Sequence, residues 1–142
     1  MLLDQLKITH ADVFTFYLKA HFYHWNIEGS NFPQYHEFLG DLYQDVFESV
    51  DTIAELIRSL DSYAPGTLSR FKDLTNIEES EIIPDAKTMM YNLYVENLKV
   101  RASLLSSFDA AENESEYGVS NFLQDRIQAH EKHSWMLRSI LK

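Results

Sequence analysis

The chain has 142 residues, 22 acidic against 12 basic side chains, and a formal net charge of −10. This length fits a single domain, residues 1–142, that is large enough to bury a hydrophobic core. The acidic excess repels phosphate backbones and so argues against nucleic acid as a partner, while the absence of cysteine excludes disulfides and thiolate metal sites.

Four long helices are predicted, because glycine and proline are scarce and fall mostly between long stretches of helical periodicity. A short turn joins the first two helices, so they should form an antiparallel hairpin, and a long polar crossover leads to the second pair. This order is typical of an all-α, ferritin-like four-helix bundle. The predicted ranges are 3–28, 33–61, 85–112 and 117–141 for the long helices, and 68–74 for a short helix inside the crossover of residues 62–83.

No apolar run reaches the roughly eighteen residues that span a bilayer, and neither end has the pattern of a secretion signal. We therefore expect a cytoplasmic protein that does not contact a membrane. Any bound metal must be held by imidazole and carboxylate groups, which favours iron, zinc or manganese.

Potential metal ligands gather around the first helical hairpin. His24 lies about one helical turn before the connection and His36 about one turn after it, so antiparallel packing should bring both imidazoles to the same end of the bundle. Asp51 and Glu55 are four residues apart, which places both carboxylates on one helix face. That face is otherwise apolar, and unpaired charges would be costly there.

These two half-sites cannot meet within one protomer, because His36 and Asp51 lie roughly 22 Å apart along a helix that rises about 1.5 Å per residue. A second copy packed about a twofold axis would set each chain's histidines opposite the other's carboxylates, in two equivalent sites. The spacing leaves one alternative open, an intrachain site of His10, Asp51 and Glu55. No glutamate is followed by a histidine three residues later, which argues against the di-iron motif of intrachain bundles.

These motifs resemble those of the Dps family, the mini-ferritins that bacteria make under starvation and oxidative stress. The resemblance covers essentially the whole chain, and it implies a hollow dodecameric shell that oxidises Fe(II), preferably with hydrogen peroxide, and stores ferric mineral. The matching segments are His24-Trp25-Asn26, Gly29, Asn31-Phe32, His36-Glu37, Asp51-x-x-Ala54-Glu55-x-Ile57-Arg58 and Trp135-Met136-Leu137-Arg138.

The resemblance also implies the ligands of an iron-oxidising (ferroxidase) site at the twofold interface. His24 and His36 would come from one subunit, and Asp51 and Glu55 from its twofold partner. His24 and the two carboxylates would hold the tighter iron, His36 would serve a weaker position, and Trp25 would pack beside the site. Zinc or manganese would be accepted by the same donors.

The chain departs from the family pattern at two places. The family usually has an aspartate four residues after the second histidine, whereas this chain has Gly40, and Asp41 is turned about 100° around the helix. The alternative function is therefore a shell that assembles but oxidises iron poorly, acting mainly in metal binding or as a structural protein. His21 is either a compensating donor or a hydrogen-bonded interface residue. DNA-compacting members commonly use a lysine-rich tail, which we do not expect in this protein, so we expect little or no DNA binding at physiological salt.

Other titratable groups have less specific patterns. Acidic residues near the last helix connection line either a pore that attracts Fe(II) or a solvated loop, two glutamates of the second helix face either a mineral cavity or ordinary solvent, and two histidines of the last helix could bind adventitious metal. The acidic residues near the last connection are Asp109, Glu112, Glu114 and Glu116. The glutamates of the second helix are Glu37 and Glu48, and the histidines of the last helix are His130 and His133.

Overall fold

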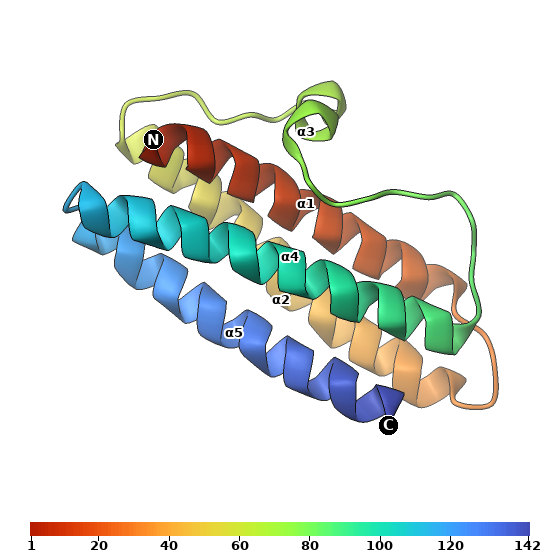
Figure 1. Ribbon diagram of the computed structural model, residues 1–142. Helices are drawn as coiled ribbons and strands as arrows, with labels where there is room; N and C mark the ends of the chain where they lie inside the picture. Colours follow the sequence, from red (N-terminus) through yellow and green to blue (C-terminus); the bar gives the residue numbers. More distant parts are fainter.

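The computed structural model describes all residues, 1–142, and consists of helices joined by loops (Figure 1). The four long helices form an antiparallel bundle, and the short α3 lies in the crossover between α2 and α4. The predicted all-α, ferritin-like architecture is confirmed, and every predicted helix boundary lies within two residues of the observed one. The bounds are α1 Leu2–Asn26, α2 Phe32–Ser59, α3 Leu68–Leu74, α4 Ala86–Asn113 and α5 Tyr117–Leu141.

Local sequence determines where several helices begin. Asp85 caps α4, because its carboxylate accepts a hydrogen bond from the Thr88 backbone N–H at 2.8 Å. Thr67 caps α3 in the same way, accepting from the Arg70 N–H at 3.2 Å. Pro33 lies in the first turn of α2, where a backbone N–H would have no helical partner anyway. These capping residues and Pro33 explain why the starts of these helices could be predicted from the sequence.

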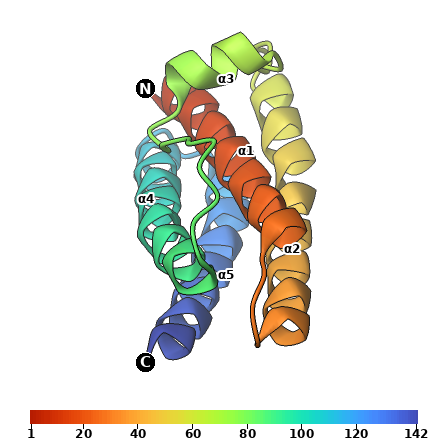
Figure 2. The same ribbon diagram turned by 90° about the vertical axis from the view of Figure 1, so that its right-hand side faces the viewer.

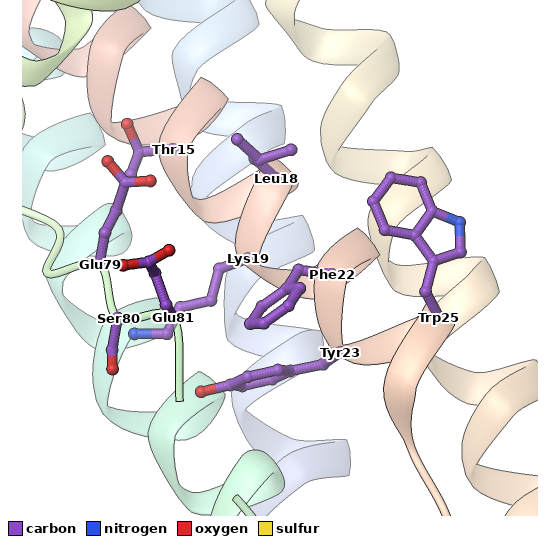
Figure 3. A pocket seen from close by; sticks show the side chains of 9 residues that line it. All are labelled: Thr15, Leu18, Lys19, Phe22, Tyr23, Trp25, Glu79, Ser80 and Glu81. Atoms are coloured by element: carbon purple, nitrogen blue, oxygen red, sulfur yellow. The ribbon is translucent and has the colours of Figure 1, made fainter. Parts of the chain in front are cut away.

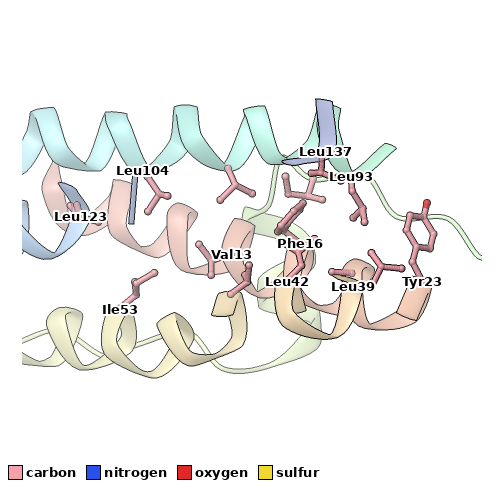
Figure 4. Packing of buried hydrophobic residues seen from close by; sticks show 14 of the residues in the cluster. Val13, Phe16, Tyr23, Leu39, Leu42, Ile53, Leu93, Leu104, Leu123 and Leu137 are labelled. Carbon is pink, nitrogen blue, oxygen red and sulfur yellow. The ribbon is translucent and has the colours of Figure 1, made fainter. Parts of the chain in front are cut away.

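The hydrophobic core runs along the bundle axis and receives side chains from all four long helices (Figure 4). α1 packs against both α2 and α4, α4 packs against α5, and α2 and α5 touch least. Burying one such aliphatic or aromatic side chain contributes about 1.5–3 kcal/mol. No helix has the combination of length and apolar character needed to cross a bilayer. The core residues labelled in Figure 4 are Val13, Phe16, Tyr23, Leu39, Leu42, Ile53, Leu93, Leu104, Leu123 and Leu137.

The crossover passes along the side of the bundle formed by α1 and α4 (Figure 2). Asp12 of α1 is buried, and its Oδ1 accepts hydrogen bonds from the Thr75 hydroxyl at 2.8 Å and the Asn76 N–H at 2.7 Å. Glu96 of α4 is also buried, and its Oε2 accepts from the Glu78 N–H at 3.2 Å. Two buried carboxyl groups on neighbouring helices thus fix the path of the crossover.

Removing the first of these anchors should destabilise the fold. We expect Asp12→Ala to lower the free energy of unfolding by about 1–3 kcal/mol, because it leaves the Thr75 hydroxyl and the Asn76 N–H without their acceptor. Asp12→Asn keeps an acceptor oxygen and should lose less. Urea unfolding midpoints at one fixed protein concentration would measure both effects, and a midpoint for Asp12→Ala equal to that of the wild type would contradict the anchoring role.

Candidate metal centre

His24, near the end of α1, and His36, near the start of α2, face each other across the α1–α2 turn. Each imidazole is bonded to the backbone of the other residue: the His24 Nδ1 lies 2.8 Å from the His36 carbonyl oxygen, and the His36 Nδ1 lies 2.9 Å from the His24 carbonyl oxygen. The two rings stack with centroids 3.8 Å apart and planes 17° apart. The predicted meeting of the two histidines at one end of the bundle is therefore observed.

This reciprocal pairing determines which ring nitrogens are free. A carbonyl oxygen only accepts hydrogen bonds, so both Nδ1 atoms carry a proton and donate. The neutral ring then keeps its lone pair on Nε2, which is the atom available to a metal ion. A backbone carbonyl that holds the distal N–H is also the usual support of a metal-bound imidazole. Each protomer therefore presents two oriented nitrogen donors side by side.

The two carboxylates of α2 form a second cluster. Asp51 and Glu55 are both exposed on the helix surface, so within one chain they do not bear the burial cost that the sequence pattern predicted. The pKa of Glu55 is raised above its ordinary value, first by a hydrogen bond shared with Asp51 and then by the repulsion between the two like charges. The carboxylates thus lie together, as their spacing predicts, and a cation would relieve their repulsion.

Within one protomer these donors do not converge, because no group of three or more His, Asp or Glu side chains is placed to hold a metal ion. The intrachain alternative with His10 is not formed. His10 is buried against α3, where its ring packs edge-on to Phe71 with centroids 5.3 Å apart, whereas Asp51 and Glu55 point to solvent. Neither ring nitrogen of His10 has a hydrogen-bond partner of good geometry, and burial lowers the pKa of His10, although the nearby Val50 backbone opposes this effect.

His21, one helical turn before His24, lies inside an aromatic cluster. Its ring stacks on Tyr43 with centroids 3.7 Å apart and planes 9° apart, and it lies 3.9 Å from the Trp25 ring on α1. Its Nδ1 shares a hydrogen bond of 2.9 Å with the Tyr17 hydroxyl. Burial, and after it the nearby His24, lowers the pKa of His21. His21 was predicted to be either an additional metal donor or a hydrogen-bonded residue, and this environment fits the hydrogen-bonded residue.

Large aromatic side chains are exposed beside this cluster. Trp25, Phe32 and Phe47 are 60%, 41% and 52% exposed. Each packs on a ring of α1 or α2 near the histidine pair. Trp25 packs on His21, Phe32 packs on His36 with ring centroids 4.9 Å apart, and Phe47 packs on Tyr17 with centroids 4.8 Å apart. Together with the two half-sites, they make one face of the α1–α2 hairpin both apolar and rich in metal donors.

The histidines of α5 belong to a separate polar network. His130 is fully buried, and its Nδ1 donates to the Asn97 Oδ1 at 2.7 Å. His133 donates from Nε2 to the Asp45 Oδ2 at 2.7 Å, and Arg126 forms a two-pronged ion pair with the same carboxylate. Protein partners thus account for both histidines, and the network joins α5 to α2 and α4.

The acidic residues near the α4–α5 connection have different environments. Glu114 accepts a hydrogen bond at 2.9 Å from the backbone N–H of Leu2, so it caps the start of α1. Asp109 and Glu112 are exposed, whereas Glu116 is half-buried. On α2, the two glutamates predicted to face either a cavity or solvent are exposed in the protomer; they are Glu37 and Glu48.

A groove of about 390 Å³ lies between α1 and the crossover (Figure 3). Lys19 reaches across it and donates to the Glu78 carbonyl oxygen at 3.0 Å. Burial lowers the pKa of Lys19, although the carboxylate of Glu96 opposes this effect. The Lys19 ammonium is thus held by the crossover. The residues that line the groove are Thr15, Leu18, Lys19, Phe22, Tyr23, Trp25, Glu79, Ser80 and Glu81.

Sequence reasoning missed two residues, one beside the histidine pair and one in the α5 network. Tyr43, which stacks on His21, lies seven residues after His36 and so on the same face of α2, a spacing that could have identified it. Asp45 is the residue in the α5 network, and its signal is that Arg126, His130 and His133 follow one face of α5 at helical spacing and indicate a polar partner.

Comparison with known proteins identifies the family. A family model described as a ferritin-like domain matches residues 3–142. Antigen TpF1 of Treponema pallidum is 32% identical over 142 residues, covering 98% of this chain and 79% of that protein. The DNA protection during starvation protein of Brevibacillus brevis is 30% identical over 127 residues, covering 89% of this chain and 85% of that protein.

A solved structure agrees with these relatives. The Dps protein of Vibrio cholerae, described as a member of a superfamily of ferritin-like diiron-carboxylate proteins, superposes with a TM-score of 0.95 at 27% identity, covering 99% of this chain and 89% of that one. The motifs around the two histidines, the bundle with its long crossover and the comparisons agree. The chain therefore belongs to the Dps family of ferritin-like proteins.

Proposed function

We propose that this protein is a mini-ferritin that oxidises Fe(II) with hydrogen peroxide and stores the ferric product inside a hollow shell. The observation that carries the proposal is the reciprocal His24–His36 pair, which leaves two Nε2 donors side by side, on a chain that also carries a pair of neighbouring carboxylates on α2. Mixed imidazole and carboxylate ligation suits iron, and also zinc or manganese. The protein would act in the cytoplasm as a defence against oxidative stress.

The site requires a second subunit. His24 and His36 of one protomer would bind iron together with Asp51 and Glu55 of a twofold-related copy, since one protomer alone does not gather three ligands. The exposed aromatic face described above would then be covered by that copy, which would relieve the cost of leaving large apolar rings in water. Assembly of six such pairs would give the dodecameric shell that the family resemblance implies.

The chemistry follows from what the ligands can hold. Two bound Fe(II) ions each give one electron to one hydrogen peroxide molecule, the O–O bond breaks, and two protons complete two water molecules. Because both electrons are delivered at one place, no single-electron step has to release a hydroxyl radical. The protein supplies position and negative charge, whereas the electrons come from the metal.

Stopped-flow oxidation of Fe(II) by peroxide tests this function. We expect a rapid phase in the wild type that slows by about a hundredfold or more in His24→Ala and in Asp51→Ala, because removing a direct ligand should cost more than the 10–100-fold loss seen for groups behind the ligands. Asp73→Ala, an exposed aspartate on α3, makes the same charge change away from the site and should leave the rapid phase intact.

A second candidate function is favoured by Gly40, which stands where the family usually has a carboxylate. A protein that lacks this donor would assemble and bind metal but would oxidise iron slowly, serving as a metal-binding or structural shell. The same stopped-flow experiment distinguishes the two functions: in this case the wild type would react no faster than Asp51→Ala. The expectation of little or no DNA binding stays a prediction, based on the net charge of −10.

A further inference from the structure

At Gly40, the space that a side chain would fill is occupied by the imidazole of another residue, His24. A Cβ atom added at Gly40 would lie 3.2 Å from the His24 Cε1 and 3.5 Å from the His24 Nδ1. At Gly29, Gly66 and Gly118 an added Cβ would meet nothing within 4 Å. The His24 ring therefore occupies the space into which any side chain at position 40 would begin to extend.

The orientation of the His24 ring depends on this space. The ring is bonded through Nδ1 to the His36 carbonyl, stacks on the His36 ring, and lies against the buried backbone of Gly40. A contact of 3.2 Å is closer than ordinary van der Waals packing between carbon atoms, so a methyl group at position 40 would displace the ring by a few tenths of an ångström. Such a shift strains the Nδ1 hydrogen bond and redirects the free Nε2.

We propose that Gly40 is a positioning residue for the metal site: its lack of a side chain seats the His24 imidazole so that His24 and His36 form one paired nitrogen half-site. This inference rests on the proposed function and extends it. Position 40 itself contributes no donor atom, so each subunit offers a divalent cation two imidazole nitrogens from this half-site. The oxygen donors must come from the twofold-related copy.

The test is Gly40→Ala in the assembled protein, with Co²⁺ as the probe because its visible absorption reports coordination geometry. We expect Co²⁺ affinity to fall by about tenfold, the scale found when a group that orients a metal ligand is altered, and the absorption bands to change in shape and intensity. Thermal stability should stay equal or rise, because alanine favours a helix interior more than glycine does. A purely structural role would predict the opposite pattern, a stability loss with unchanged Co²⁺ spectra.

Gly118→Ala is the matched control, since Gly118 lies in the first turn of α5 and an added Cβ there meets open space. It should leave the Co²⁺ affinity and spectrum unchanged. Unchanged Co²⁺ binding in Gly40→Ala would overturn the positioning role while leaving the ferroxidase proposal standing. If the wild type bound no Co²⁺ in a His24-dependent manner, the proposed function would fail, and this inference with it.

Discussion

Two inactive variants, His24→Ala and Asp51→Ala, should regain about one quarter of wild-type ferroxidase activity when they are co-expressed in equal amounts and assemble at random into twofold pairs. Half of the pairs would then contain one chain of each kind. In such a pair, one site has lost both its histidine and its carboxylate, whereas the other combines an intact histidine with an intact carboxylate. Neither parent alone contains an intact site.

The expected recovery follows from the separation of the two half-sites. His36 and Asp51 lie on the same helix, α2, roughly 22 Å apart at about 1.5 Å per residue, and no cluster of three potential ligands forms within the protomer. If the site is shared between chains, co-assembly of a chain substituted in one half-site with a chain substituted in the other half-site restores some intact sites. If the site is contained in one chain, no intact site forms, because every chain in the mixture carries a substitution in its own site.

Co-assembly of two variants that are substituted in the same half-site provides the control. His24→Ala combined with His36→Ala should stay inactive, because every site in the mixture then lacks one histidine. Native mass spectrometry would establish that both kinds of chain are present in single assemblies, and stopped-flow Fe(II) oxidation would measure activity. If mixed assemblies of His24→Ala and Asp51→Ala formed but remained inactive, the shared site would be refuted.

The helices and the pairing of residues within each half-site could be predicted from sequence because their signals are local. Helical periodicity together with Pro33 and the capping residue Asp85 determines where helices begin. The nearness of His24 and His36 follows from their places on either side of one short turn. Asp51 and Glu55 share a face because they are four residues apart.

The remaining features depend on how deeply and at what rotation the helices pack. The hydrogen bonds between His24 and His36 require the two helices to meet at one depth, which the spacing of residues along the chain does not specify. The fit of the His24 ring over Gly40 is likewise a contact between helices. The sequence alone shows that Gly40 replaces the carboxylate that the family usually has. It does not show that the His24 ring fills the space beside Gly40.

Replacing Asp45 should cause a large loss of stability. We expect Asp45→Ala to lower the free energy of unfolding by about 2–3 kcal/mol, less than for a fully buried ion pair because the Asp45 side chain is 38% exposed. The Arg126 side chain is only 12% exposed and would lose both of its hydrogen bonds to carboxylate oxygens, at 3.1 and 2.8 Å. Urea unfolding at fixed protein concentration would measure the loss.

The reason for a large effect is that this carboxylate joins two helices that otherwise touch little. α2 and α5 have the smallest contact of the long-helix pairs that meet, and Asp45 on α2 binds both Arg126 and His133 on α5. The Nε of Arg126 is already buried without a partner, so losing Asp45 would leave more of this guanidinium unsatisfied. Asp41→Ala, one turn earlier on α2 and exposed, is the control and should change the unfolding midpoint little.

The pH dependence of this difference has a definite sign. Burial favours the neutral form of Asp45, but hydrogen bonds from His133 and Arg126 outweigh burial and hold the pKa of Asp45 well below its ordinary value. A carboxyl group whose pKa is lowered on folding stabilises the protein above its unfolded pKa of about 4, and this contribution is lost as the pH falls below that value. The stability gap between wild type and Asp45→Ala should therefore narrow as the pH falls below about 4. A gap that failed to narrow there would show that Asp45 does not stabilise the fold as a carboxylate.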